Sequence, residues 1–189
     1  TNLDELVKAM VGRSLDSRFP PLTNTPGEPV LVVKNLATKY APMLKDISFE
    51  LKKGEILGIY GLVGAGRSEL LEALFGVRTL SDGEIYFKGK RIFFNSAKDA
   101  MKENFAFVTE ERKVNGMFGK EDLVYNTCIA NIDKYKQFGV INNTKMRNAC
   151  DRQIDAMHVK CTSGKDKISA LSGGNQQKVI IGKWLERNP

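Results

Sequence analysis

Histidine, cysteine and tryptophan are scarce in this chain of 189 residues. The single histidine, His158, excludes a metal centre built from several imidazoles and argues against a Ser-His-Asp triad, so we interpret it as an ordinary helix residue. The three cysteines, Cys128, Cys150 and Cys161, show neither CxxC nor His-linked metal spacing. They are typical of reduced thiols in a cytosolic protein.

Long hydrophobic runs are also missing. The longest uncharged apolar stretch covers residues 56–66, far short of the roughly 20 residues that cross a bilayer. Asp4 and Glu5 stand where a secretion signal would begin with basic and then apolar residues. We therefore expect neither a membrane span nor a signal peptide, and the beginning is typical of the middle of a longer chain.

The charge is positive without being concentrated. Lys and Arg number 29 against 22 Asp and Glu, a net charge of +7, yet no block of five or six basic residues occurs. This distribution favours a solvated basic surface over a nucleic-acid site. With 42% hydrophobic and 27% charged residues the chain is expected to be globular.

The first part of the chain predicts a boundary. Leu3–Val11 is a candidate amphipathic helix, and prolines then forbid helix up to residue 29. We expect residues 1–28 to be the end of a preceding domain and an interdomain linker.

The following segments predict an α/β core. Val30–Val33 and Ile47–Leu51 are typical of strands, the second with one wet face. The apolar runs Glu55–Tyr60 and Phe105–Val108 are typical of buried strands, and Arg67–Phe75 carries a helical apolar face.

Additions to this core are also expected. They are a turn at Ser81-Asp82-Gly83, a hairpin of 84–87 with 91–94, a helix from Ser96 to Met101, a mainly helical stretch from Lys120 to about Cys161 that is clearest in Thr144–His158, and a helix over Val179–Leu185.

Residues 61–68 match the phosphate-loop spacing G-x-x-x-x-G-K-[ST], with arginine in place of lysine. The candidate binding residues are Gly61, Gly64, Ala65, Gly66, Arg67 and Ser68. Such glycines let backbone N–H groups converge on phosphate, and the serine hydroxyl stands where Mg²⁺ is held. Because the planar fork of arginine cannot replace the compact ammonium, and because Glu69 adds negative charge, we expect nucleotide binding to survive and hydrolysis to weaken.

A second anion-binding device is predicted at Leu171–Lys178, with the sequence LSGGNQQK. Ser172 offers a hydroxyl, Gly173 and Gly174 expose backbone N–H groups, and the helix that follows favours an anion at its N-terminus. We call residues 171–176 the signature turn.

With both devices the chain resembles the nucleotide-binding domains of ATP-binding-cassette (ABC) transporters, whose signature LSGGQ closes over the γ-phosphate held by the facing domain. The segments Met10–Arg13, GLVGAGRSE, Val108–Lys113 and LSGGNQQKVIIGKWL are similar to the second half of tandem sugar-import ATPases. TEER and Met157–Lys160 are most similar to the galactose/methylgalactoside type.

The resemblance implies an α/β fold, namely a P-loop NTPase (ABC ATPase) core with an antiparallel β subdomain and a helical subdomain at about 115–165, within a partial domain at 29–189. It implies ATP and Mg²⁺ as cofactors, with Gln176 as part of the signature. Glu110 stands at the position of a glutamine that senses Mg²⁺ and the membrane subunit, or else is an ordinary loop acid. Tyr40 either stacks on adenine or is a strand-edge tyrosine.

Catalytic residues of the family are absent from the chain. No apolar strand ends in Asp-Glu, so the Walker-B aspartate and the catalytic glutamate are missing, and His158 precedes the signature and cannot be the switch histidine. The resemblance places that strand just beyond Pro189. We therefore expect a truncated piece of a longer protein, inactive in hydrolysis by itself.

The implied partners are membrane permease subunits, a facing nucleotide-binding domain and, indirectly, a sugar-binding protein, at the cytoplasmic face of the membrane and without nucleic acid. A GTPase would need N-K-x-D, and a small-molecule kinase would need the loop lysine and leave LSGGNQQK unexplained. Two alternatives stay open. One is a non-transport tandem cassette ATPase of translation or DNA repair, and the other is a non-hydrolysing regulatory module.

Overall fold

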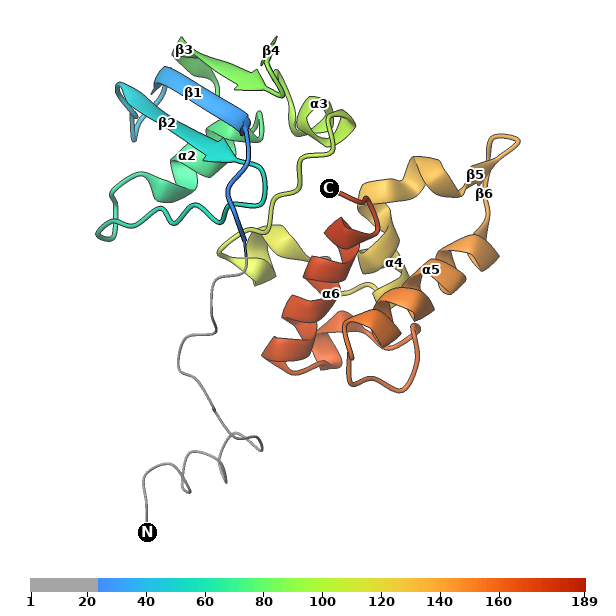
Figure 1. Ribbon diagram of the computed structural model, residues 1–189. Coiled ribbons are helices and arrows are strands. Elements are labelled where there is room, and N and C mark those ends of the chain that lie inside the picture. Colours follow the sequence, from blue (N-terminus) through green and yellow to red (C-terminus); the bar gives the residue numbers. More distant parts are fainter. Residues whose placement is uncertain (1–23) are drawn as a thin grey trace.

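The structure is a computed structural model that describes residues 24–189. The predicted helix Leu3–Val11 and most of the predicted linker lie outside the described residues. Figure 1 shows two parts, a sheet accompanied by helices and a separate group of helices that includes the C-terminal one. Within the described range no helix is long and apolar enough to cross a membrane.

The sheet has four antiparallel strands in the order β2-β1-β3-β4. Its strands are β1 (Pro29–Thr38), β2 (Ile47–Lys52), β3 (Leu80–Phe87) and β4 (Lys90–Ile92). Val33 on the central strand lies opposite Phe49 of β2 and Ile85 of β3. Both predicted N-terminal strands and the predicted hairpin are confirmed, although β4 ends at Ile92, two residues early.

The turn predicted at residues 81–83 is wrong, because β3 runs through these residues. Gly83 has a φ of +103°, and a Cβ on it would lie 2.5 Å from the Cα of Leu36. The register of β1 against β3 shifts at this place, between Lys34 and Ala37. Asp-Gly therefore marks a β-bulge where the two backbones come close, since the same left-handed freedom serves turns and bulges.

The helix predicted at Arg67–Phe75 is confirmed as α2 (Arg67–Leu74), which covers one face of the sheet (Figure 1). Its Leu70, Ala73 and Leu74 are buried against Val33 and Ile85 of the strands. Leu44, from the loop between β1 and β2, belongs to the same cluster. The beginning of α2 is thereby fixed against the sheet.

The strands predicted at Glu55–Tyr60 and Phe105–Val108 are not formed. Ile56 and Tyr60 are 92% and 94% exposed, the opposite of the predicted burial on both faces. A strand needs a neighbour for its backbone N–H and C=O groups, and neither segment has one among residues 24–189. The prediction rested on apolar composition, which does not show whether a neighbouring strand is present.

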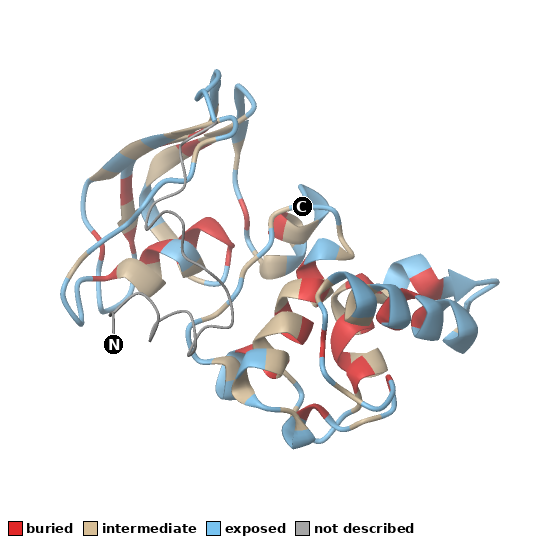
Figure 2. Ribbon diagram, turned by 60° about the horizontal axis from the view of Figure 1, so that its bottom comes forward, coloured by how far each residue is buried: buried red, intermediate tan, exposed pale blue. Residues whose placement is uncertain are grey.

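The second part is mainly helical, as predicted. Its elements are α4 (Leu123–Cys128), η2 (Ile129–Tyr135), α5 (Asn143–Ala156), η3 (Ile168–Ala170) and α6 (Gly173–Leu185), with the short hairpin β5 (Lys136–Gln137) and β6 (Val140–Ile141) before α5. Leu123, Cys150 and Ile168 are fully buried and belong to one cluster. Figure 2 shows buried and exposed residues together along these helices. Because α5 ends at Ala156, the interpretation of His158 as a helix residue is wrong, and it follows the helix with a φ of +49°.

An aromatic cluster joins the two parts. Phe75, directly after α2, meets the ring of Trp184 on α6 edge to face, with centroids 5.6 Å apart. Phe94 and Ala100, which belongs to α3 (Ala97–Lys102), complete the buried cluster. The last turn of α6 is thus attached to the end of α2, while the signature turn lies at the other end of α6, about 20 Å away along a helix of 13 residues.

Candidate nucleotide-binding site

The phosphate loop closes by a turn and leads directly into α2. The N–H of Ala65 donates to the carbonyl of Leu62 at 3.0 Å. Gly64 and Gly66 have φ values of +83° and +84°, which glycine adopts without strain. The first hydrogen bond of the helix runs from Leu70 N–H to Gly66 O. The N–H groups of residues 67–69 therefore lie at the positive end of α2.

Arg67 folds back over the loop. A Cβ on Gly61 would lie 3.6 Å from Cδ of Arg67 and 2.9 Å from Cβ of Ala65. No side chain would fit at position 61 without displacing Ala65. Gly61, Ala65 and Arg67, three of the predicted binding residues, are therefore packed against each other.

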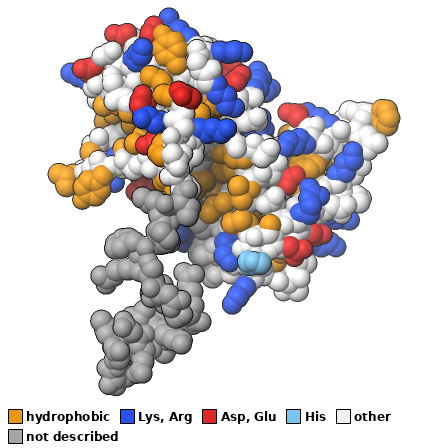
Figure 3. All heavy atoms as spheres, in the orientation of Figure 1, with side chains coloured by type: hydrophobic (Ala, Val, Ile, Leu, Met, Phe, Trp, Pro, Cys, Tyr) orange, Lys and Arg blue, Asp and Glu red, His pale blue; other side chains and the backbone are white. Residues whose placement is uncertain are grey.

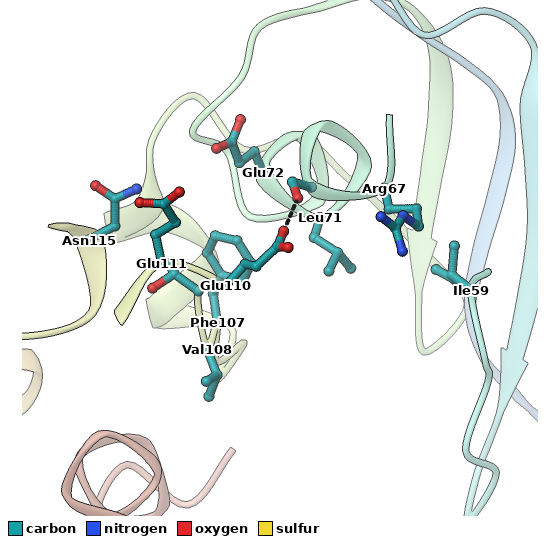
Figure 4. A pocket seen from close by; sticks show the side chains of 11 residues that line it. Ile59, Arg67, Leu71, Glu72, Phe107, Val108, Glu110, Glu111 and Asn115 are labelled. Atoms are coloured by element: carbon teal, nitrogen blue, oxygen red, sulfur yellow. Dashed lines mark hydrogen bonds between the residues drawn. The ribbon is translucent and has the colours of Figure 1, made fainter. Parts of the chain in front are cut away.

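A cavity of about 510 Å³ opens beside the first turn of α2 (Figure 4). Arg67 and Glu72 line it from the α2 side, and Phe107 and Glu110 line it from the segment that follows α3. The hydroxyl of Ser68 donates to Oε2 of Glu110 at 3.0 Å, a contact between residues 42 positions apart. The structure thus brings together the predicted Mg²⁺ serine and the predicted sensor residue.

Tyr40 lies in the loop between β1 and β2, with 59% of the residue exposed. Arg78, which pairs with Glu72 of α2 at 3.2 Å, donates to the backbone oxygen of Tyr40 at 3.5 Å. In the same loop, Cδ2 of Leu44 lies 2.6 Å from where a Cβ of Gly66 would be. The loop that carries Tyr40 is therefore attached to α2 and to the phosphate loop. Nζ of Lys39 lies over the Tyr40 ring, 5.5 Å from its centroid.

The signature turn begins α6. Ser172 occupies the N-cap position with extended backbone, and its Oγ accepts from Nδ2 of Asn175 at 3.0 Å. Gly173 and Gly174 form the first turn, and a Cβ on Gly174 would meet nothing within 4 Å. The second glycine thus faces open space.

Gln176 is buried, 5% exposed, and its side chain is used within the fold. Its Nε2 donates to the carbonyls of Ile168 at 3.2 Å and Leu171 at 3.0 Å. Its Oε1 accepts from Nε of Arg112 at 3.3 Å. The amide of this predicted binding residue therefore holds the signature turn against the segment that follows Glu110. The sequence assigns no role to Arg112, because nothing local indicates a partner 64 positions away.

The two predicted devices lie in different places. The cavity beside the phosphate loop is lined by none of residues 171–178. Figure 1 shows α2 beside the sheet and α6 among the helices. Within residues 24–189 they are two half-sites rather than one. The side of the molecule seen in Figure 3 intersperses basic and acidic side chains.

The three thiols are free. Cys128 and Cys150 are completely buried between α4 and α5, and burial raises the pKa of their thiols to about 11 and about 12. Neither can react as a surface group.

Residues 44–189 match the family model described as "ABC transporter". The match covers most of the chain, and the chain belongs to the ABC transporter family. A relative from Treponema denticola, named galactose/methyl galactoside import ATP-binding protein MglA, is 60% identical over the whole chain. The protein of the same name from Treponema pallidum is 60% identical over 99% of the chain. The chain spans about 38% of the length of these relatives.

Solved structures share the fold. The ATP-binding cassette MJ1267 aligns with a TM-score of 0.69 and 21% identity, covering 86% of this chain and 66% of that one. The cassette MJ0796, described as a dimer in a post-hydrolysis state bound to ADP and Pi, aligns with a TM-score of 0.67 and 21% identity over 84% of this chain and 70% of that one. The antiparallel sheet and the helices are thus those of an ABC ATPase.

Proposed function

We propose that this chain is part of the ATP-binding subunit of an ABC importer that takes up galactose or methylgalactoside. The observation that carries the proposal is the 60% identity, along the whole chain, to relatives named for that import. The fold and both half-sites agree with this function. In the full-length protein, ATP binding and hydrolysis drive the uptake.

The phosphate-loop cavity fits a nucleotide. The amides at the start of α2 would face the phosphates. Tyr40 lies outside the lining of this cavity, but its residue is 59% exposed and its ring would offer a flat surface to adenine. Mg²⁺ binds oxygens octahedrally at about 2.0–2.1 Å, so neighbouring ligands are roughly 2.9 Å apart. Ser68 Oγ and Glu110 Oε2 are joined by a 3.0 Å hydrogen bond, so both oxygens are close enough to bind one Mg²⁺ once that bond is given up. Bound Mg²⁺ would neutralise phosphate charge.

Mg²⁺ in nucleotide sites usually keeps several waters and substrate phosphates as ligands, and we expect these to complete its coordination here. Arg67 supplies charge in place of the usual lysine, but its fork does not reproduce a compact ammonium. A non-hydrolysing regulatory site is therefore the second candidate for this half-site, favoured by Arg67.

The separation of the half-sites supports a facing domain as one partner of this chain. Ser172, Gly173 and Gly174 would act on nucleotide held by a facing nucleotide-binding domain. The membrane partners would be permease subunits at the cytoplasmic face, served indirectly by a sugar-binding protein, and we propose no nucleic acid. We also propose that a domain boundary lies at residue 28 and that residues of about 115–165 form the helical subdomain.

The test is reconstitution of the full-length protein with its permease in vesicles. We expect galactose uptake that requires ATP and Mg²⁺. Normal ATPase activity without any association with a permease would instead support a tandem cassette protein of translation or DNA repair.

The permease is expected to meet the helical stretch at 120–161. The native thiols Cys128 and Cys150 of this stretch are unsuitable as cross-linking points, because both are buried. Cysteines at exposed Asn148 on α5 and exposed Lys34 on β1 make a matched pair. Capture of the permease from position 148 alone supports this surface, and capture from position 34 alone refutes it.

A further inference from the structure

The segment Glu110–Gly116 connects the two half-sites, and we call it the connecting segment. At its start, Glu110 accepts the hydrogen bond from Ser68 beside the phosphate loop. Two residues later Arg112, the first residue of the π-helical turn η1 (Arg112–Gly116), reaches the signature turn. Only Glu111 separates these two contacts.

Arg112 lies against the first residue of α6. A Cβ on Gly173 would be 2.6 Å from Nη2 and 3.3 Å from Cζ of Arg112. The guanidinium therefore covers the glycine backbone, while its Nε donates to Gln176 Oε1 at 3.3 Å. This combination requires the planar arginine fork, because a lysine ammonium could not cover the glycine and bond the amide together.

The rest of the segment follows the same face of α6. Gly173, Gln176, Ile180 and Lys183 are spaced three, four and three residues apart, which places them on one side of a helix. A Cβ on Gly116 would lie 3.2 Å from Cδ1 of Ile180. Nζ of Lys183, whose pKa is lowered by burial, donates to Gly116 O at 2.7 Å. The turn η1 is thus held along α6 by contacts at both of its ends, Arg112 and Gly116.

We propose that Arg112 is a positioning residue that holds the signature turn through Gly173 and Gln176 and links it to Glu110 at the phosphate loop. A ligand that takes the Ser68 hydroxyl or the Glu110 carboxylate breaks the bond between them. The change then moves Arg112 and the glycines that this chain offers to the facing nucleotide. The effect on ATPase activity rests on the proposed function, whereas the effect on the turn does not.

The test uses the full-length protein with Arg112→Met, Arg112→Lys and the control Arg91→Met. Arg91 is an exposed arginine at the sheet edge, paired with Glu84 at 3.1 Å. Hydrogen exchange of the peptide 171–180 should quicken about tenfold in Arg112→Met and remain unchanged in Arg91→Met, since a hydrogen bond from a charged donor is lost. Arg112→Lys should fall between them.

The kinetic readout separates positioning from binding. We expect Arg112→Met to lower kcat of the reconstituted ATPase about tenfold, with KM for ATP within about twofold. Gln176→Leu should have a similar effect, and the double variant Arg112→Met/Gln176→Leu should be little worse than either alone. If Arg112→Met fails to fold, Arg112→Lys carries the same comparison.

Two results would overturn the proposal. One is unchanged exchange at 171–180 in a folded Arg112 variant, and the other is full additivity of the Arg112 and Gln176 effects. If the wild-type protein has no ATPase activity, the proposed function fails. The exchange measurement then still decides the role of Arg112.

Discussion

Gly66→Ala should destabilise the protein by about 2–5 kcal/mol. Two effects add at this position. Gly66 has a φ of +84°, where an L-residue is strained by about 1–2 kcal/mol. The new Cβ would also lie 2.6 Å from Cδ2 of Leu44, a side chain only 7% exposed, and overpacking of this kind costs about 1–3 kcal/mol.

Two other glycines allow the backbone strain at positive φ to be measured without the overpacking. Gly64 in the same loop and Gly89 in the β3–β4 hairpin have φ values of +83° and +77°, and a Cβ on either meets nothing within 4 Å. Their alanine variants should lose only about 1–2 kcal/mol. Urea denaturation followed by circular dichroism measures all three. If Gly66→Ala is no worse than Gly89→Ala, Leu44 does not confine the phosphate loop.

The same variants connect the loop to function. Gly64→Ala and Gly89→Ala should be equally stable, yet only the first should weaken nucleotide binding, because it changes the backbone that faces the phosphates. Titration with a fluorescent ATP analogue measures this difference. Equal affinities would refute the assignment of the loop as the phosphate site.

Three further predictions concern the thiols and the half-sites. Because the pKa values of Cys128 and Cys150 are raised to about 11 and about 12, the folded state keeps protons that the unfolded state loses above about pH 9. Stability should therefore be unaffected below pH 9 and fall above it in urea titrations, and a stability that rises there would contradict the burial. Glu110→Gln should raise the Mg²⁺ concentration needed for half-maximal nucleotide binding severalfold in a metal titration, and no change would remove Glu110 from the metal site. Gly173→Val in the full-length protein should lower ATPase activity about 10²–10³-fold, the effect of losing one preorganised donor, and Arg67→Ala much less. The opposite order would make this chain's own phosphate loop the working one.

Local sequence patterns correctly predicted the elements whose structure is determined by residues close to them in the chain. Alternation in 47–51 gave a strand with one wet face, and the glycine spacing at 61–68 gave the loop and the start of α2. Both features are set by neighbours within a few residues. The helix predicted at Thr144–His158, observed as Asn143–Ala156, belongs to the same class, since its buried apolar positions lie on one side.

Elements that depend on a distant partner were not predictable. The run Glu55–Tyr60 has the composition of a buried strand, but a strand forms only where another offers its hydrogen bonds. Gly83 could be recognised as a residue with left-handed freedom. Whether that freedom serves a turn or a bulge depends on Leu36, 47 positions earlier, which no local pattern reveals.

The candidate site divides in the same way. The glycines and Ser68 follow from a motif, and Glu110 was placed by resemblance to the family. Its contact with Ser68 and the burial of Gln176 became visible only in three dimensions. Arg112 was missed because its two contacts, with Gly173 and Gln176, join segments that the chain separates by more than 60 positions.

Arg67 and Arg112 together suggest how a phosphate loop that hydrolyses poorly could still have a regulatory role. Under the proposed function, Arg67 replaces the lysine that suits hydrolysis, but the amides of α2 and the pair formed by Ser68 and Glu110 would still hold a nucleotide. On our proposal for Arg112, binding would break the hydrogen bond between Ser68 and Glu110. The loss of that bond would then be felt through Arg112 at Gly173 and Gln176 in the signature turn. A half-site that binds without hydrolysing would then still regulate its partner, because coupling requires a difference in binding free energy and not turnover.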